Sequence, residues 1–453
     1  TLNGQSTTKT YAELLTTNVV KNVTCKNGST TIWDYDNNYL TFTSIKVPDY
    51  CTIDFTDGYI VTLTATNGSI TPTSQTVGNG GTAKFTVTPN SGFKAELETN
   101  TCGGTLSSNI YTISNITSNK TCSITFKPKL PTLYDKILAD NSAIKTRTNF
   151  NTTFTETNTG TLYKATESIA GNTPKDVYYF AGDAKNNWVK FAGFYWRIIR
   201  TNHDSSIRLL YSGTSPDTTS GYIWTSKFNS YNDPMYVGYM YGTSGSLENN
   251  RLNTNNSAIK IYIDNWYNNN LSSYSKYIST EAVYCNDREL APGSTYNTAN
   301  VNFFYAPYGR LITNKTPTYN CTNNKDAFSG SNSEAKLTYP IGLMTADEVA
   351  YAGGKAFTNL PSPYAWYYLN SAGGSITGST YWYSLSPIYW RGSFSWVWGV
   401  AGSDNTGYLG RNDVLGSLAV RPAISLKFCI KYSTGNGAPE TPYEIVLDPD
   451  ISC

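Results

Sequence analysis

The stretch YWYSLSPIYWRGSFSWVWGVAGSDNTGYLGRNDVLGSLAVRPAISLK, residues 381–427, decides how this chain is interpreted. Both of its ends have the aromatic and apolar composition of core strands, and a proline stops the first run. Its middle follows neither the two-residue period of a strand nor the period of a helix. The sequence therefore predicts a backbone framed by glycines and aromatic residues, on which the intervening side chains are free to differ.

The irregular middle of this stretch supplies the candidate binding residues. They share no polarity, size or period, and glycines separate them, so we expect residues 388–418 to form a binding face. The alternative interpretation is an ordinary Gly/Asn-rich loop region. The candidate ligand-binding residues are Ile388, Tyr389, Arg391, Phe394, Trp398, Ser403, Asp404, Asn405, Thr406, Tyr408, Arg411, Asn412, Asp413 and Leu415.

The frame YW-SLSP, followed by glycines and AVRPAISL, resembles the C-terminal half of C-type-lectin-fold domains of the formylglycine-generating-enzyme type. More narrowly, it resembles the variable proteins of diversity-generating retroelements. In that family a reverse transcriptase rewrites adenines, mostly in AAC-type codons, and the products never include Trp. The candidate residues other than Trp398 belong to the permitted set, whereas Trp390, Trp396 and Trp398 do not and are assigned to the framework or to other codons. The resemblance implies a diversified binding face on a C-type-lectin-type domain.

Composition favours a mostly β protein with a few helices, of the α+β class. Of the 453 residues, 14% are aromatic and only 15% are charged, with a net charge of +2. Such a chain favours β-structure over long helices. There is no basic stripe of the kind that binds nucleic acid, and no segment apolar enough to span a membrane. The chain starts without Met, so we expect an export signal or anchor to have been removed.

The cysteines predict an oxidising compartment. They are even in number, fall in four neighbouring couples and lack CxxC spacing, which favours four local disulfides. With a single His, a Cys/His zinc site is not expected, so no metal or cofactor is predicted. The calcium motif of sugar-binding animal lectins is absent, although a structural calcium ion lined by Asp and Asn is compatible with the sequence. The expected disulfide cysteines are Cys25, Cys51, Cys102, Cys122, Cys285, Cys321, Cys429 and Cys453.

Two small β-modules are expected before the large domain. In the first, residues 1–57, the apolar spacing from Tyr11 to Val23 predicts a short helix, and two strands turn at residues 36–38. Residues 58–129 have strand-like runs separated by Gly- and Asn-rich turns. They resemble a bacterial surface repeat, which implies an Ig-like spacer.

A linker and lead-in, residues 130–176, precedes a C-type-lectin-type ligand-binding domain over 177–453. Within that domain, residues 249–274 have a helical apolar spacing. The strongest helix signal follows Thr345, the expected N-cap. Glu348 would complete a capping box, and Gly353 would end the helix.

The sequence contains no recognisable set of catalytic residues, so no enzyme activity is predicted. The single imidazole, His203, stands beside Asp204 in a turn. The sequence predicts a secreted or cell-surface protein of adhesin or receptor type, with a protein or glycan ligand on another cell or phage surface. Anchoring to a pilus or surface through the N-terminus fits this prediction. Two alternatives stay open: a structural pilus or surface-layer subunit, and a glycan-active enzyme formed by carboxylates that meet in space.

Overall fold

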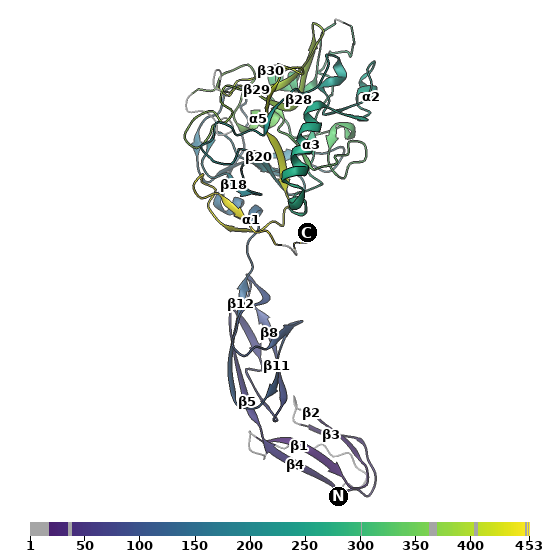
Figure 1. Cartoon of the computed structure of the whole chain (residues 1–453), viewed down its shortest axis with the longest axis vertical. Helices are drawn as coiled ribbons and strands as arrows, with labels where there is room; N and C mark the ends of the chain where they lie inside the picture. Colours follow the sequence, from purple (N-terminus) through teal and green to yellow (C-terminus); the bar gives the residue numbers. More distant parts are fainter. Residues whose placement is uncertain are drawn as a thin grey trace. The chain divides into compact units, whose positions relative to one another are not determined.

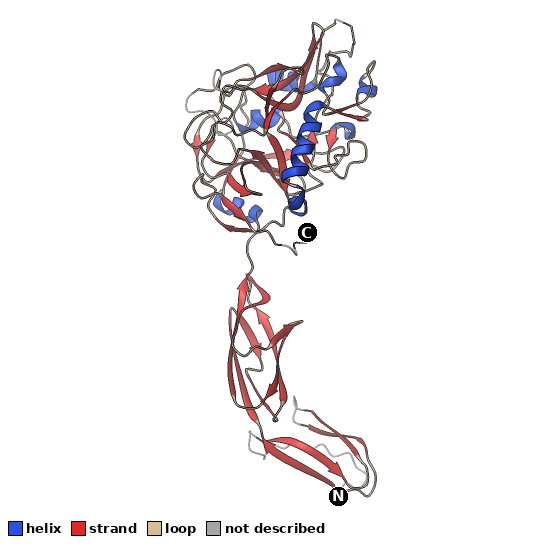
Figure 2. Ribbon diagram, in the orientation of Figure 1, coloured by secondary structure: helices blue, strands red, loops and turns tan. Residues whose placement is uncertain are grey.

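The computed structural model describes residues 18–34, 39–299, 301–361, 369–402, 406–448, 451 and 453. The chain divides into two compact units, Thr1–Leu130 and Pro131–Cys453. Both units are rich in strands, and every described helix belongs to the second (Figure 2). The protein is thus mostly β with a few helices, as the composition predicted. None of the described helices combines the length and the apolar character that a membrane crossing needs.

The first unit begins with two small antiparallel ribbons. Strand β1 (Asn18–Cys25) pairs with β4 (Cys51–Asp57), and β2 (Thr30–Asp34) pairs with β3 (Tyr39–Ser44), as the sequence predicted for the second pair. The helix expected up to Val23 is wrong over the described residues, which form β1. The adjacent Val19 and Val20 are both buried, and two neighbouring buried residues imitate a helical spacing. A bulge between Val20 and Asn22 follows them.

The rest of the first unit is a small sandwich of two four-stranded sheets, in agreement with the small β-module predicted there. Phe85, Tyr111 and Phe126 meet in the core between the sheets. The first sheet has the order β10 (Thr105–Ser107), β11 (Ile110–Ile116), β8 (Gly81–Pro89), β6 (Gly68–Thr71). The second has the order β7 (Ser74–Val77), β5 (Tyr59–Thr66), β12 (Lys120–Pro128), β9 (Phe93–Asn100).

Two larger sheets organise the second unit. The lead-in expected over 130–176 belongs to this unit, because Leu133 and Ile137 of α1 (Leu133–Asp140) enter its core. The larger sheet contains β13 (Ala143–Lys145), β15 (Thr161–Glu167), β16 (Lys175–Tyr179), β19 (Phe194–Thr201), β18 (Trp188–Phe191), β34 (Tyr443–Ile445), β33 (Tyr432–Thr434), β20 (Ile207–Tyr211), β32 (Pro422–Leu426) and β27 (Ile341–Leu343).

The second large sheet contains most of residues 381–427, whereas β32 at the end of that stretch belongs to the larger sheet. It has the order β21 (Trp224–Ser226), β31 (Leu418–Val420), β28 (Trp382–Arg391), β29 (Phe394–Val400), β30 (Leu409–Asp413), and β25 (Phe303–Phe304) pairs with the far end of β28. The smaller strands are β14 (Thr157–Asn158), β17 (Asp183–Ala184), β22 (Met240–Tyr241), β23 (Asn255–Asn256), β24 (Tyr284–Cys285) and β26 (Ala327–Phe328). Strands β28–β30 lie at the end of the unit opposite α1 and the C-terminus (Figure 1).

The two helices predicted in the large domain are present, and the first of them is shorter than predicted. The helix expected over 249–274 is α3, Ala258–Asn270, whose Ile259 and Ile263 are buried. In α5, Ala346–Ala352, the Thr345–Glu348 capping box and the stop at Gly353 are confirmed. The other helices are α1 (Leu133–Asp140), α2 (Leu247–Asn250), α4 (Ala306–Tyr308), η1 (Pro234–Val237), η2 (Ser272–Tyr277), η3 (Gly309–Asn314) and η4 (Asn324–Asp326).

All four predicted disulfides are present, each joining neighbouring cysteines. The pairs are Cys25–Cys51, Cys102–Cys122, Cys285–Cys321 and Cys429–Cys453. They are consistent with a compartment outside a reducing cytosol.

Candidate functional site

The candidate binding residues fall on strands β28, β29 and β30, and the exposed ones share a face. Residues paired across antiparallel strands point to the same side of a sheet. Arg391 is paired with Phe394, Trp398 with Arg411, and Trp396 with Asp413. Because side chains alternate along a strand, these residues all project from one side of the sheet. We call this side, with Phe304 and Tyr308, the aromatic face.

Aromatic rings pack in series along the aromatic face. Tyr389 lies 6.0 Å from Trp396 between ring centroids, and 5.9 Å from Phe304 of β25. Tyr308 of α4 stacks on Phe304 at 4.2 Å and completes the row on one side. Phe394 packs at 6.3 Å from Trp396 on the other side. The row therefore unites two segments that are about 80 residues apart in the sequence.

Arg411 is held in place over this row of rings. Its guanidinium carbon lies 5.3 Å from the Trp396 ring centroid, and its Nη1 donates a hydrogen bond of 3.0 Å to Tyr389 Oη. A cation stacked on an indole in this way keeps its remaining N–H donors directed at solvent. In the described part of the chain, no carboxylate lies within ion-pair distance of Arg411 or of the exposed Arg391. The aromatic face thus presents stacking surfaces beside two arginines that have no carboxylate partner among the described residues.

The backbone beneath the face is fixed by turn and packing glycines. Gly392 and Ser393 both have positive φ, 59° and 68°, the conformation of a tight type I′ hairpin between β28 and β29. A Cβ on Gly410 would lie 2.4 Å from the Tyr408 ring, so only glycine lets that ring lie against β30. The prediction that glycines set this backbone is therefore correct at these two places.

Several candidate residues are not available for contact, which corrects the sequence prediction. Ile388, Tyr389 and Trp398 are 0%, 2% and 0% exposed, and Thr406 is also buried. The cause is cover from elsewhere in the chain: β25 and α4 lie over Tyr389, and the Phe357 ring packs 5.5 Å from Trp398.

The other candidates differ in exposure. Arg391, Phe394 and Arg411 are exposed, whereas Tyr408, Asn412, Asp413 and Leu415 are half-buried. Asp413 Oδ1 accepts from the backbone N–H of Leu415 at 2.8 Å, which orders the turn after β30. Ser403, Asp404 and Asn405 lie outside the described residues.

Three contributors to the aromatic face were missed by sequence reasoning: Phe304, Tyr308 and Trp396. Trp396 was assigned to the framework, yet it is half-buried and lies under Arg411. Phe304 and Tyr308 come from the segment FFYAPY, residues 303–308, which lies between Cys285 and Cys321. The density of aromatic residues in that segment was the available signal.

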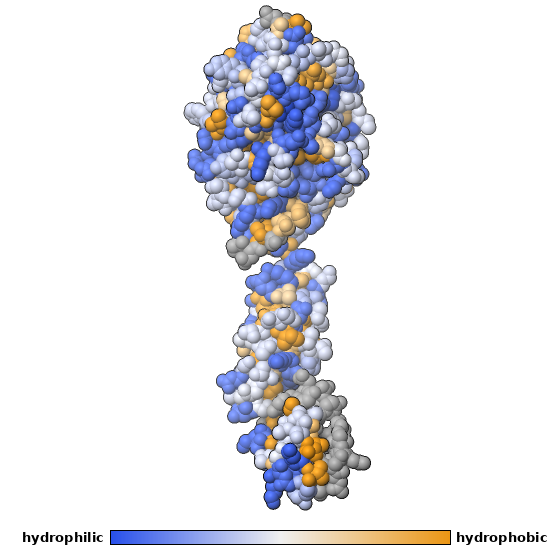
Figure 3. All heavy atoms as spheres, turned by 90° about the vertical axis from the view of Figure 1, so that its right-hand side faces the viewer, coloured by the Kyte–Doolittle hydropathy of each residue, from blue (hydrophilic) through white to orange (hydrophobic). Residues whose placement is uncertain are grey.

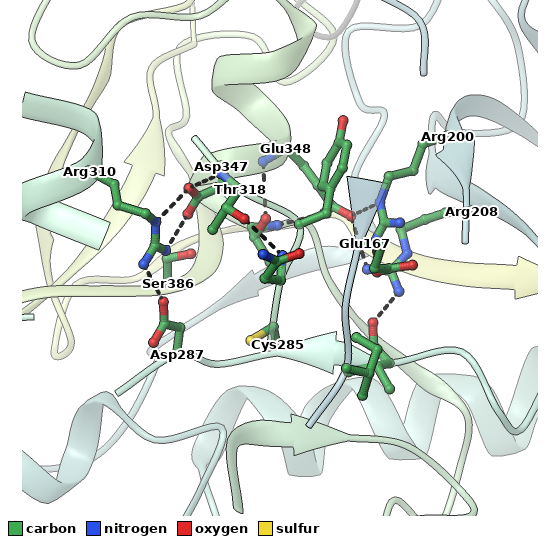
Figure 4. A pocket seen from close by; sticks show the side chains of 15 residues that line it. Glu167, Arg200, Arg208, Cys285, Asp287, Arg310, Thr318, Asp347, Glu348 and Ser386 are labelled. Carbon is green, nitrogen blue, oxygen red and sulfur yellow. Dashed lines mark hydrogen bonds and ion pairs between the residues drawn. The ribbon is translucent and has the colours of Figure 1, made fainter. Parts of the chain in front are cut away.

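A second candidate is the charged cavity in the interior of the unit (Figure 4). It has a volume of about 20 Å³, room for little more than one water molecule. Glu348 Oε1 accepts from Arg200 Nε at 2.8 Å and from Arg208 Nη1 at 3.0 Å, and Arg200 Nη2 also donates to Glu167 at 2.8 Å. Across the cavity, Arg310 bridges two aspartates. These side chains are engaged with one another, so the cavity is an ionic core that joins α5 to β15, β19 and β20.

The pKa values in this ionic core are governed by burial and by the arginines. Burial would raise the pKa of Glu167, but the charge of Arg200 and hydrogen bonds from His203 and Arg200 outweigh it and lower the pKa to about 2. Burial likewise opposes ionisation of Glu348, yet Arg208 and Arg200 hold its pKa below the usual value. Burial raises the pKa of Asp287 in spite of Arg310. The network therefore contains carboxyl groups with lowered pKa values and one with a raised pKa.

The large unit is expected to lose stability in acid. A carboxylate whose pKa is lowered by folding contributes stability that is complete above its unfolded pKa of about 4.3 and is lost as the pH falls through the folded value. Glu167 and Glu348 act in this sense, whereas Asp287 offsets part of the effect. We expect the melting temperature to fall by about 5–10 °C between pH 5 and pH 2.5, measured by near-UV circular dichroism. An unchanged melting temperature would contradict the assignment of the ionic core.

Comparison of the chain with protein families, with curated proteins and with solved structures finds no match.

Proposed function

We propose that the protein is a secreted or cell-surface ligand-binding protein of adhesin or receptor type. Its second unit is a C-type-lectin-type domain, and the aromatic face is its binding face. The observation that carries the proposal is the position of Arg391, Phe394 and Arg411, which project from one face of a paired sheet without entering the core. Aromatic and arginine side chains are the ones that most often dominate binding energy.

The sheet beneath the face supports such a role. Ile388, Tyr389 and Trp398 fill the core, so substitutions at the exposed positions change the surface and leave the packing intact. This separation of buried framework residues from exposed residues favours diversification by a retroelement, in which adenine-bearing codons change and framework codons do not. The four disulfides fit an extracellular location.

The binding prediction can be tested on arrays of glycans and of purified extracellular proteins. Phe394→Ala is expected to weaken binding of the full chain to the array member that it binds by at least about tenfold, because an exposed aromatic anchor is lost. Its melting temperature should stay within about 2 °C, since the side chain is 45% exposed. The matched control is Ile261→Ala on α3, 50% exposed and outside the aromatic face, which should bind normally.

A genomic test addresses the diversification itself. The locus is expected to contain a near-copy of the codons for 381–427, next to a reverse-transcriptase gene, that differs only at adenines. The differences should fall at exposed positions such as Arg391, Phe394 and Arg411, and spare the codons of Ile388 and Trp398, whose side chains are buried. A locus without such a copy would leave the aromatic face a fixed surface. Differences concentrated at buried positions would contradict the proposal.

A further inference from the structure

Three aromatic residues of β29 lie on the aromatic face at every second position, and their exposure falls along the strand. Phe394 is 45% exposed, Trp396 is half-buried and Trp398 is 0% exposed. Residues two apart on a strand share one side of the sheet and lie about 7 Å from each other. The aromatic row of β29 therefore continues to Trp398, which differs from the other two rings because it is covered.

The cover is a turn formed by residues 355–358. The ring of Phe357 in this turn lies 5.5 Å from the Trp398 ring between centroids. The turn pairs with β30 at a single residue, Leu409. Ala356 forms a β-bridge with Leu409, and the N–H of Phe357 donates to Leu409 O at 2.8 Å. A turn that is paired at one residue opens at a lower cost than a strand held in a ladder of hydrogen bonds.

The backbone at Phe357 has an unusual conformation for an aromatic residue. Its φ is 54°, in the left-handed region, and no other aromatic residue in the described part of the chain has a positive φ. A bulky side chain is strained in this region, whereas glycine is not. In the closed turn, the packing of the Phe357 ring on Trp398 offsets the strain. Strain of this kind is concentrated in segments that take part in function.

Beneath the cover, the indole N–H of Trp398 is buried and has no hydrogen-bond acceptor among the described residues. Trp196 in the larger sheet is equally buried and shows the usual arrangement, because its Nε1 donates to Phe191 O at 3.1 Å. A buried donor without an acceptor lowers the stability of the closed protein. The closed turn therefore shields the Trp398 ring from water and leaves its N–H unsatisfied.

A cover over Trp398 also fits the surface of the large unit. On the side drawn in Figure 3, this unit shows hydrophobic residues only in small, separated patches. An uncovered Trp398 beside Trp396 and Phe394 would form a larger apolar patch, which is unfavourable in water and typical of binding sites. The closed turn avoids that exposure in the unbound protein.

We propose that the turn of residues 355–358 is a displaceable cover, and that Trp398 is the floor of a glycan subsite that opens when Phe357 moves away. A sugar ring has C–H groups on its faces, which stack on the indole, and oxygens at its edge, one of which accepts from Trp398 Nε1. An apolar side chain of a protein ligand would leave that N–H unpaired. Arg411, the cross-strand neighbour of Trp398, presents further N–H donors.

This inference rests on the proposed binding function and deepens it in two ways. It names a glycan as the ligand class. It also adds Phe357, which lies outside 381–427, as a residue that controls access to the aromatic face.

A first measurement detects the opening without a ligand. In the full chain with isotope-labelled tryptophan, NMR resolves the indole N–H signals, and Trp398→Phe and Trp196→Phe assign the two that matter. We expect the Trp398 N–H to exchange with solvent at least about tenfold faster than that of Trp196, because movement of one turn releases it. Phe357→Gly should accelerate exchange at Trp398 further and leave Trp196 unchanged. Equal exchange rates for the two indoles would overturn the displaceable cover.

A second measurement uses the glycan array, followed by biolayer interferometry with the array glycan that the full chain recognises. Phe357→Gly is expected to tighten binding about threefold to tenfold, because the closed turn no longer competes with the ligand. Trp398→Phe is expected to weaken binding about tenfold, since a ring remains but the donor is lost. Trp196→Phe is the matched control and should bind normally. Its melting temperature should fall further than that of Trp398→Phe, because only Trp196 loses a hydrogen bond.

The outcomes separate this inference from the function on which it rests. If Phe394→Ala weakens glycan binding while Phe357→Gly and Trp398→Phe bind as the unmodified chain does, the aromatic face stands and the covered subsite is overturned. Recognition of proteins alone on the two arrays would also overturn the subsite and leave the binding function standing. Affinity for no member of either array would count against the subsite and the aromatic face together.

Discussion

Replacing Glu348 by alanine is expected to lower the free energy of unfolding of the large unit by about 3–5 kcal/mol. Glu348 Oε1 binds Arg200 and Arg208, and its Oε2 accepts from the N–H of Thr345 at 2.9 Å. All these side chains are buried, with Glu348 at 1% and Arg208 at 0% exposure. The variant would leave two guanidinium groups without their shared counter-charge and would also remove one half of a capping box.

Urea unfolding followed by tryptophan fluorescence measures this effect. The matched control is Glu444→Ala. That side chain is half exposed and lies 3.9 Å from Lys190, so its loss should change the free energy of unfolding by less than about 0.5 kcal/mol. A cost below about 1 kcal/mol for Glu348→Ala would mean that water screens the ionic core, and the account given for its lowered pKa would be wrong.

The second large effect is expected from Trp382→Ala, at about 3–5 kcal/mol. Trp382 is 1% exposed and lies at the start of β28, paired with Val400 on one side and Ala419 on the other. Its ring also lies 5.1 Å from the guanidinium of Arg421, a residue that is 0% exposed. Alanine would open a cavity in the core and remove the aromatic cover of a buried cation.

Trp224→Ala is the corresponding control on the same sheet. Trp224 is 64% exposed on the outer strand β21, so truncation should stay within about 0.5 kcal/mol of the unmodified chain. Thermal unfolding of both variants would show that Trp382 belongs to the buried framework of the sheet and Trp224 to its surface. Similar melting temperatures for the two would indicate that the sheet is not the rigid support that the proposed binding function needs.

Local chemistry allowed much of the fold to be predicted from the sequence. The Thr345–Glu348 capping box is a pattern of four residues, and the disulfides join cysteines 20 to 36 residues apart. The sandwich of residues 58–129 has turn signals at regular spacing. The first helix was wrong because Val19 and Val20 are both buried although they are neighbours on a strand, and hydrophobic spacing alone cannot distinguish such a pair from one face of a helix.

The candidate site was harder to predict because its exposure depends on distant segments. Whether Tyr389 is exposed is decided by Phe304 and Tyr308, about 80 residues earlier, and whether Trp398 is exposed is decided in part by Phe357. Nothing in the local pattern of 381–427 specifies these partners. The sequence did single out this segment, because an aromatic and glycine frame with irregular polar insertions is itself a local feature. Its middle, however, was expected to be neither strand nor helix, and it forms β28, which continues through Pro387, with β29 and β30.

The first residues of the large unit are hydrogen-bonded to residues 430–431, near its C-terminal end, which favours transfer of the unit as a single piece. The N–H of Leu133 donates to Ile430 O at 2.7 Å, and Thr132 forms a β-bridge with Lys431. Strands β28–β30 lie at the opposite end (Figure 1). The unit can therefore be grafted into a loop of another protein, or joined to a carrier at either of its ends, with the linkers leaving from one place and the aromatic face unobstructed.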